Sequence, residues 1–443
     1  MANVLPSDLR GDFVLRRASV SGCLLPPDFR AVAQGDLAIV DIEVVSGAIR
    51  ALRPSDAVEV AGDAVFDMDY GMVLPTLVDM HTHLDKGHIW QRNANPDGTF
   101  GGALAAVAED RLAHWNAEDV RTRMEFGLRC AYAQGTSVVR THIDSLPPQE
   151  TISWPVFEEV RAEWSGRVEL QGACLFGIDR LIDEPGFLDV IADRVKQAGG
   201  VLGAVTYMVP GLDGLLDRIF EAAMSRGLDL DFHVDETNDP AAKSLRHIAE
   251  AALRAKFDGK IVCGHCCSLA QQDMEEADRT LDLVASAGIG VVSLPMCNMY
   301  LQDRSPGRTP RWRGVTLLHE MKARGIPVAV ASDNTRDPFY AYGDLDLIEV
   351  YAQATRILHL DHPVGDWISA VSTAPAGMLG VPAPSISDGA AANLILFRGR
   401  NWSELLSRPS APRDVIRDGF TLNDRVPDYR ELDHLMTGNG AVL

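Results

Sequence analysis

The sequence has few of the features that mark secreted, membrane-bound or nucleic-acid-binding proteins. Its seven cysteines are odd in number and scattered from Cys23 to Cys297, which does not fit the paired framework of a small secreted protein. No apolar run is long enough to span a bilayer, and no segment has the basic-then-apolar pattern of a signal peptide. The formal net charge of -21 argues against a nucleic-acid polymer or an anionic membrane as partner. We therefore expect a cytoplasmic protein that binds a small neutral molecule.

Motifs for nucleotide cofactors and for structural zinc are also missing. The chain has neither a phosphate loop nor a G-x-G-x-x-G pattern. One C-x-x-C pattern, from Cys263 to Cys266, has no second copy, and on a strand its two side chains would point to opposite faces. We interpret these two cysteines as small buried residues.

Strand-like and helix-like segments alternate through the centre of the chain. The strand candidates are Val73–His81, Thr136–Ile143, Val168–Phe176, Val201–Tyr207, Leu228–His233, Lys260–His265, Gly290–Leu294 and Pro327–Ser332. Several of the helices between them stop at a glycine, as at Gly135, Gly227, Gly288 and Gly325, where a left-handed cap is favourable. Strand, helix and glycine repeated to a count of eight predict an α/β fold, a parallel (β/α)₈ TIM barrel. A doubly wound open sheet is the alternative.

Both ends of the chain carry short β-like runs without helical periodicity. The N-terminal runs include Cys23–Leu25 and Leu37–Val40, and residues 387–420 contain a second set that includes Ala392–Phe397. Since neither set can bury much surface alone, we expect them to close one small β-sandwich around the central insertion. The predicted domains are 1–71 for the N-terminal part of the sandwich, 72–384 for the barrel, and 385–443 for the C-terminal part and tail.

Two histidines separated by one residue stand at the end of the first barrel strand. Side chains alternate along a strand, so His81 and His83 point to the same side and are close enough to share a metal ion. The ends of later strands carry His142, His233, His265 and Asp333. Because active sites of (β/α)₈ barrels lie at the C-terminal ends of the strands, this placement indicates a metal site.

The chemistry of these side chains narrows the choice of metal. The candidate ligands are His81, His83, His233 and Asp333. Three imidazoles with one carboxylate suit Zn²⁺ or Fe²⁺ better than Mg²⁺ or Ca²⁺. One divalent ion held there would lower the pKa of water toward neutrality. Asp333 has two possible roles, as a ligand and as the base that accepts a proton from that water.

Three further residues are candidates for proton transfer or support. Glu236 follows His233 by three residues, where the strand gives way to a loop, and can carry protons to a ring nitrogen and to a leaving group. The alternative for Glu236 is a charge at a helix N-terminus. His265 either polarises an oxygen or is an ordinary core histidine. His142 either supports a ligand or only packs.

Taken together, these motifs resemble the amidohydrolase superfamily, and within it the cytosine deaminase branch. The resemblance covers residues 73–380 and is carried by Asp79–Asp85, Arg140–Asp144, Phe232–Glu236, Gly264–His265 and Ala331–Phe339. It implies one Fe or Zn ion on the four ligands named above, Glu236 as proton shuttle, and His265 as the residue that holds the activated water or polarises the substrate. Two-metal barrels of this type place a lysine at the fourth strand, and Ala204–Tyr207 contains none. The resemblance also implies a homo-oligomer.

The resemblance further implies hydrolytic deamination of a small nitrogen heterocycle. Activated water would attack an amino-bearing ring carbon while Glu236 protonates the adjacent ring nitrogen, Asp333 takes the proton of the water, and ammonia leaves. Three residues match positions that line the pyrimidine pocket in that family, namely Phe100, Leu175 and Phe339.

Two positions depart from the cytosine deaminase pattern. Gly177 stands where those enzymes have a glutamine that reads the pyrimidine edge, so a hydrogen-bonding side chain is missing unless Asp179 replaces it. Asn334 follows the metal aspartate where those enzymes tend to have a second aspartate. The same pattern is found in N-isopropylammelide amidohydrolases, which lack the glutamate that matches Glu236. Both departures leave room for a substrate bulkier than cytosine.

The expected function is therefore metal-dependent deamination of cytosine, a 5-substituted cytosine or a related cyclic aminoimine, with release of ammonia. The alternative within enzymes is a cyclic amide or N-alkyl amidohydrolase of the N-isopropylammelide hydrolase type. A catalytically silent barrel that serves as a binding protein would lack a ligand or the shuttle, and this sequence has all of them.

Overall fold

Eight parallel strands form the centre of the computed structural model, which describes residues 11–30, 36–55 and 64–436. They are β6 (Leu77–Thr82), β7 (Thr136–Asp144), β8 (Glu169–Leu175), β9 (Leu202–Thr206), β10 (Leu230–Val234), β11 (Ile261–His265), β12 (Gly290–Ser293) and β13 (Val328–Val330). Two sheets, β6-β7-β8 and β9 to β13, are joined by parallel bridges between Ala173 and Val201 and between Thr82 and Asp333. The strands therefore follow one another around a ring, and the fold is TIM-barrel-like, with all eight predicted barrel strands present.

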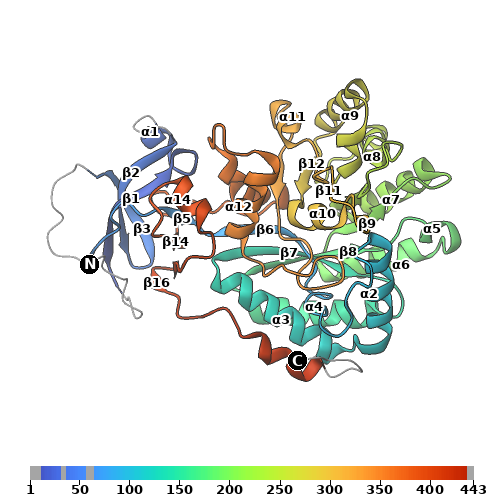
Figure 1. Ribbon diagram of the computed structural model, residues 1–443, viewed down its shortest axis with the longest axis horizontal. Helices are drawn as coiled ribbons and strands as arrows, with labels where there is room; N and C mark the ends of the chain where they lie inside the picture. Colours follow the sequence, from blue (N-terminus) through green and yellow to red (C-terminus); the bar gives the residue numbers. More distant parts are fainter. Residues whose placement is uncertain (1–10, 31–35, 56–63, 437–443) are drawn as a thin grey trace.

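Helices lie around these strands in Figure 1. They are α2 (Phe100–His114), α3 (Ala117–Ala133), α4 (Glu150–Trp164), α5 (Arg180–Asp183), α6 (Phe187–Ala198), α7 (Leu212–Arg226), α8 (Ser244–Ala255), α9 (Met274–Ser286), α10 (Pro295–Leu301), α11 (Leu318–Ala323), α12 (Leu347–Leu358) and α13 (Thr373–Leu379). In α7 the buried residues Leu212, Leu216 and Ile219 recur at the helical period, which turns one apolar face to the barrel. The helix ends at Gly227, whose φ of 63° is the left-handed conformation predicted for a cap.

Strands from both ends of the chain share a second, smaller core, seen beside the barrel in Figure 1. The first sheet has the order β3 (Ala48–Pro54), β2 (Leu37–Val45), β1 (Phe13–Ser21), β4 (Ala64–Asp67). The second has the order β16 (Phe420–Thr421), β15 (Asp414–Arg417), β14 (Leu394–Leu396), β5 (Val73–Pro75). Phe13 and Ile42 of the first sheet lie in one apolar cluster with Leu394 and Ile416 of the second. The packing of the two sheets as a sandwich stays a prediction.

One predicted strand at this end of the chain is wrong. The run Cys23–Leu25 overlaps a 3₁₀ helix, Gly22–Leu24, in which the amide of Leu25 donates to the carbonyl of Gly22 at 3.3 Å. Strand β1 has already ended at Ser21, and the two prolines that follow the run, Pro26 and Pro27, have no amide hydrogen for a sheet ladder. Pro27 instead begins the short helix α1 (Pro27–Arg30).

The remaining elements complete the C-terminal part of the chain. Helix α14 (Trp402–Ser407) follows β14, and a last 3₁₀ segment, η4 (Tyr429–Leu435), lies against α3. Arg129 of α3 forms an ion pair with Glu431 of η4 at 2.6 Å, so the end of the described chain is held to the barrel. Figure 1 shows this segment running from the small β sheets along the underside of the barrel.

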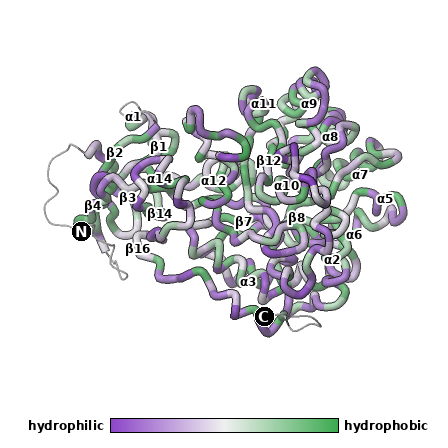
Figure 2. Tube along the Cα trace, viewed as in Figure 1, coloured by the Kyte–Doolittle hydropathy of each residue, from purple (hydrophilic) through white to green (hydrophobic). Residues whose placement is uncertain are grey.

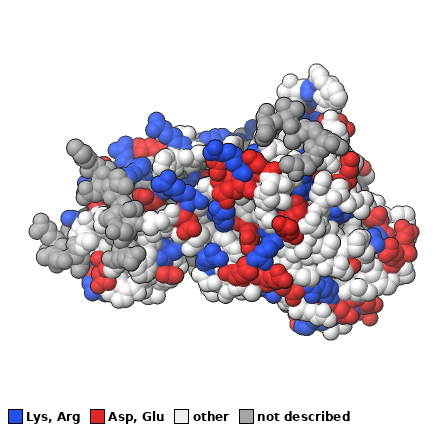
Figure 3. All heavy atoms as spheres, turned by 90° about the horizontal axis from the view of Figure 1, so that it is seen from below, with Lys and Arg blue, Asp and Glu red and all other residues white. Residues whose placement is uncertain are grey.

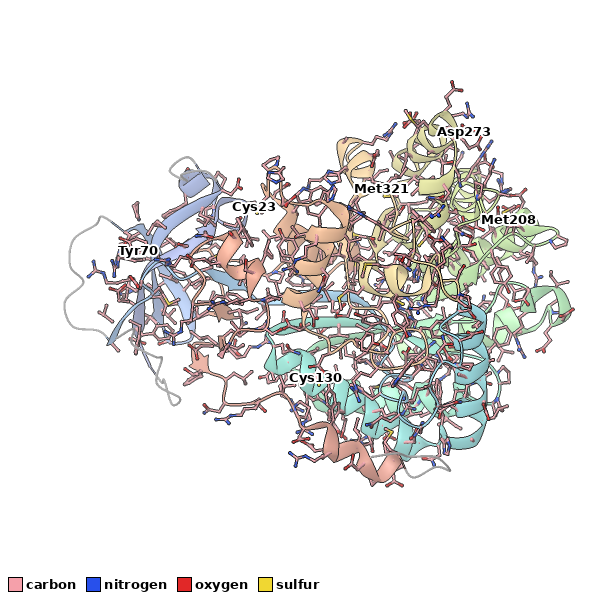
Figure 4. All side chains as sticks on the ribbon, in the orientation of Figure 1. Cys23, Tyr70, Cys130, Met208, Asp273 and Met321 are labelled. Carbon is pink, nitrogen blue, oxygen red and sulfur yellow. The ribbon has the colours of Figure 1, made fainter. Side chains whose placement is uncertain are left out.

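The helices, the charged surface and the cysteines fit what the sequence composition predicts. No helix among the described residues is long and apolar enough to cross a membrane, and in Figure 2 hydrophobic and hydrophilic positions alternate along the helices. Acidic and basic side chains are interspersed over the face shown in Figure 3. No disulfide bond joins any of the seven cysteines, all of which are among the described residues; Figure 4 labels two of them, Cys23 and Cys130, in different parts of the molecule.

Candidate active site and metal centre

Five histidines and one aspartate meet at the C-terminal ends of the barrel strands. His81, His83, His142 and His233 have ring nitrogens that all lie within 4.8 Å of one another, and His81, His265 and Asp333 form an overlapping group. All six side chains are buried. The barrel thus brings together all four residues predicted as ligands, although they come from three separate strand ends.

The distances within this cluster fit one shared cation. The Nε2 atom of His233 is 3.1 Å from Nε2 of His81 and 3.2 Å from Nε2 of His83, and Oδ1 of Asp333 is 3.2 Å from Nε2 of His83. Two ligands of one zinc-type ion with bonds of about 2.1 Å stand about 3.0 to 3.4 Å apart. The side chains present therefore have the spacing that a single divalent ion requires.

The protonation states of the cluster also fit a bound cation. Burial is the largest cause that lowers the pKa of His81, His83 and His233 well below the ordinary value, so the imidazoles are neutral. Neither carboxylate oxygen of Asp333 has a hydrogen-bond partner among the described atoms. Neutral nitrogens and an unpartnered buried carboxylate that face one another are stabilised by a cation.

Local backbone irregularities position these side chains. Strand β6 shifts register against β7 between Asp79 and Thr82, so it bulges at His81; such bulges re-aim side chains beside active sites. His265 and Asp333 have φ values of 67° and 63°, in the left-handed region that residues with a Cβ seldom adopt. At these two residues the left-handed backbone sets the direction in which the side chain enters the site.

A buried ionic network supports His142, whose role the sequence left open. Its ring lies 4.0 Å from that of His81, centroid to centroid, and its Nε2 is 3.1 Å from Oδ1 of Asp231. The other oxygen of Asp231 accepts a hydrogen bond from Arg140 at 2.8 Å. Burial by itself would raise the pKa of Asp231, but His142 and Arg140 outweigh it and lower the pKa. His142 therefore belongs to the cluster and is held in place by Asp231, which Arg140 in turn orients.

Glu236 and His265 are joined by a residue that sequence reasoning missed. Asn298 of α10 donates from Nδ2 to Oε1 of Glu236 at 3.0 Å and to Nδ1 of His265 at 2.9 Å. Burial, followed by the nearby Asp333 carboxylate, raises the pKa of Glu236 well above its ordinary value. This environment favours the protonated form of Glu236, which is the form that a general acid needs.

A cavity of about 730 Å³ opens onto these groups. All five residues predicted to bind substrate line it, namely Phe100, Leu175, Gly177, Asn334 and Phe339. The rings of Phe100 and Phe339 meet edge to face with centroids 5.5 Å apart. Lys86, Arg111 and Asp144 also line the cavity and were not predicted; the carboxylate of Asp144 pairs with Lys86 at 2.7 Å and with Arg111 at 3.0 Å.

Gly177 leaves space that two neighbouring side chains occupy. A Cβ atom at this position would lie 2.5 Å from Oδ1 of Asp179 and 3.1 Å from the hydroxyl oxygen of Tyr207. That hydroxyl donates to Oδ1 of Asp179 at 2.6 Å. Asp179, which the sequence offered as a replacement, and Tyr207, which it did not, therefore place hydrogen-bonding groups beside Gly177. In contrast, the amide of Asn334 is turned toward the protein, where Nδ2 donates to Asp337 at 2.7 Å.

Comparisons with known proteins show the family of this chain. Residues 185–422, more than half of the chain, match the model of the Amidohydrolase family, and a pterin deaminase of Rhizobium rhizogenes is 55% identical over 422 residues, which covers 95% of this chain and 96% of that protein. The chain belongs to the amidohydrolase family. It is therefore an enzyme, an aminohydrolase, as the resemblance implied, and the metal dependence of the superfamily agrees with the buried histidine cluster.

Two solved structures show the same fold at lower identity. The 5-methylcytosine deaminase of Klebsiella pneumoniae, liganded with 5-fluorocytosine, superposes with a TM-score of 0.80 at 22% identity and covers 94% of this chain and 98% of its own. The N-isopropylammelide isopropylaminohydrolase of Burkholderia multivorans has a TM-score of 0.74 at 22% identity, covering 93% and 98%. At this identity the likeness concerns the fold.

Proposed function

We propose that this amidohydrolase removes the exocyclic amino group of a pterin ring by hydrolysis and releases it as ammonia. The observation that carries the proposal is a 55% identical pterin deaminase that matches nearly the whole chain. A pterin has two fused rings, and the cavity of about 730 Å³ is large enough for such a molecule. Cytosine, which the sequence suggested, is a smaller substrate than this cavity allows, whereas the expectation of a bulkier ring agrees with it.

The four residues that would hold the metal are His81, His83, His233 and Asp333, whose donor atoms have the spacing described above. When bound there, a divalent zinc or iron ion supplies the Lewis acidity that makes water a nucleophile at neutral pH. The imidazoles are already neutral, so they offer lone pairs without first losing a proton.

The side chains next to these ligands would move the protons. Glu236, whose pKa is raised chiefly by burial, donates a proton to the ring nitrogen beside the carbon under attack. Asp333 accepts the proton that the attacking water gives up. His265 polarises the oxygen. The Glu236 carboxylate then takes the remaining proton of the added hydroxyl and delivers it to the amino group, so that the carbon–nitrogen bond breaks and ammonia leaves. The proton held by Asp333 returns to Glu236 and restores the starting state.

The cavity wall would select the ring. Phe100 and Phe339 provide an apolar contact for a flat heterocycle, and Leu175 adds to it. At Gly177 the carboxylate of Asp179, oriented by Tyr207, would accept a hydrogen bond from a ring N–H. This pair takes the place of the glutamine found in cytosine deaminases.

An ammonia-release assay tests the proposal. Zinc-, iron- and manganese-loaded protein is given pterin, cytosine, 5-methylcytosine, isocytosine, creatinine and N-isopropylammelide. We expect the highest kcat/KM for pterin, by at least about tenfold over cytosine, because the larger ring fills more of the cavity. Turnover of cytosine that equals or exceeds that of pterin would refute the substrate. An amine released from N-isopropylammelide, with no reaction of pterin, would support the N-alkyl hydrolase instead.

A substitution at Gly177 sharpens this test. Gly177→Gln restores the cytosine-type side chain and places its Cβ against Asp179 and Tyr207. We expect kcat/KM for pterin to fall by about 5- to 160-fold, because a clash of this kind costs about 1–3 kcal/mol. Gly186→Ala is the control, since no atom lies within 4 Å of its Cβ position. Unchanged pterin turnover in Gly177→Gln would show that this wall does not contact the substrate.

The organisation of the chain stays part of the proposal. We propose that residues 1–71 and 385–443 form one β-sandwich and that residues 72–384 form the barrel; parts of both terminal ranges lie outside the described residues. Limited proteolysis that cuts first near residues 71 and 385 would support these limits. A homo-oligomer also stays a prediction, which light scattering tests.

A further inference from the structure

A single buried amide connects the two groups that are to act on the substrate. Asn298 is fully buried and lies on α10, next to the end of β12. Its Nδ2 atom donates both to Oε1 of Glu236, at 3.0 Å, and to Nδ1 of His265, at 2.9 Å. An amide NH₂ group carries two hydrogens, so each acceptor receives one.

This contact determines which nitrogen of His265 carries the proton. Because an amide nitrogen donates and does not accept, Nδ1 of His265 has to be the acceptor. The proton of the neutral ring is therefore on Nε2. The Nε2 atom has no partner among the described protein atoms, and His265 lines the cavity. The ring consequently offers an N–H donor for an oxygen of water or substrate.

The same amide holds Glu236 beside the ring. Oε1 of Glu236 is 3.5 Å from Nδ1 of His265, and Asn298 lies between them with a hydrogen bond to each. Gln302, one turn along the chain from Asn298, donates to the backbone carbonyl of Glu236 at 3.1 Å. Both the side chain and the backbone of Glu236 are therefore held from the segment around α10.

We propose that Asn298 is a positioning residue that keeps His265 in its Nε2–H tautomer and fixes the Glu236 carboxyl group next to it. The roles of the two held residues rest on the proposed function, whereas the tautomer does not. An aspartate would reverse the hydrogen bond, since a carboxylate accepts from Nδ1–H and offers no donor to Glu236. An alanine removes both hydrogen bonds without reversing either.

The test measures the tautomer and the kinetics in the zinc-loaded enzyme. Protein labelled with ¹⁵N-histidine shows by NMR which ring nitrogen of His265 carries hydrogen, and a His265→Gln variant assigns the signals. We expect an Nε2–H signal in the natural protein, an Nδ1–H signal in Asn298→Asp, and a mixture in Asn298→Ala. With pterin, kcat should fall about 100-fold or more in Asn298→Asp while KM changes less than about threefold, because proton transfer rather than binding is impaired.

Controls separate this role from general damage. Asn116→Asp makes the same change at the N-cap of α3, where only the side-chain oxygen is used, and should alter neither the His265 signals nor kcat. If Asn298→Asp loses zinc or folds poorly, Asn298→Ala carries the test. An Nδ1–H signal in the natural protein, or an unchanged tautomer or unchanged kcat in a folded Asn298 variant, overturns the proposal. If the natural enzyme releases no ammonia from pterin, the proposed substrate fails while the tautomer measurement still decides the role of Asn298.

Discussion

Gly264 is the position where the smallest change should disturb the metal centre most. It lies on β11, and a Cβ atom there would be 2.9 Å from Cε1 and 3.2 Å from Nδ1 of His81. Carbon atoms in contact prefer about 3.5–4.0 Å, so Gly264→Ala requires the ring to move by about 0.6 Å or more. His81 is fully buried, and its ring centroid lies 4.0 Å from that of His142 and 4.5 Å from that of His233. The ring of His81 therefore has no free space to move into.

The structure sets the expected size of the effect. Overpacking of this kind costs about 1–3 kcal/mol of folding stability. Metal sites tolerate only about 0.2 Å of change in ligand distance, and disturbed ligand orientation weakens metal affinity by about 10–100-fold. We therefore expect Gly264→Ala to lower the folding stability of the metal-free protein by about 1–3 kcal/mol. Its affinity for zinc should fall by about 10–100-fold. Calorimetry measures the first, and competition with a chelator of known affinity measures the second.

A matched glycine tests whether the effect belongs to this site. Gly214 lies exposed on α7, and no atom is within 4 Å of its Cβ position. Gly214→Ala should leave zinc affinity unchanged and raise stability by up to about 1 kcal/mol, because alanine is the better helix former. If Gly264→Ala kept the zinc affinity and stability of the natural protein, His81 would be neither confined as described nor required as a ligand.

Three further changes have defined outcomes. Glu236→Gln should keep its zinc, measured by elemental analysis, yet lower kcat for pterin by about 100-fold or more, because the amide has no proton to give; full activity would remove Glu236 from the mechanism. Asp231→Asn leaves the buried guanidinium of Arg140 without its charge partner and should cost about 3–5 kcal/mol in urea unfolding, whereas a loss under 1 kcal/mol would contradict the network. Burial, and after it two nearby arginines, lowers the pKa of His88 to about 3 in the folded protein. As the pH falls below about 6.5, the unfolded chain therefore binds a proton at His88 that the folded protein does not bind. Stability should therefore decrease between about pH 6.5 and 3, and His88→Asn should make this decrease shallower; an identical slope in both proteins would refute the assignment.

The parts of this protein that follow from local rules were predictable from the sequence. Each predicted barrel strand overlaps an observed one, because a buried parallel strand is a short apolar run bounded by helices and glycines, and both signals are local. The H-x-H pair follows from the alternation of side chains along one strand, and His233 and Asp333 follow from their positions at strand ends. The strand predicted at Cys23–Leu25 was wrong because a short apolar run does not by itself distinguish a strand from a 3₁₀ turn.

The contacts that give the site its chemistry depended on tertiary structure. Asn298 and His265 are 33 positions apart, and no motif in the sequence indicates that they meet. The pairing of Tyr207 with Asp179 over Gly177 likewise joins two different strand ends. Residue type and strand position identified the candidate ligands and the acid, because these are properties of single segments. Which nitrogen carries a proton and how much space a glycine leaves depend on atoms from distant segments, and only the closed barrel brings those atoms together.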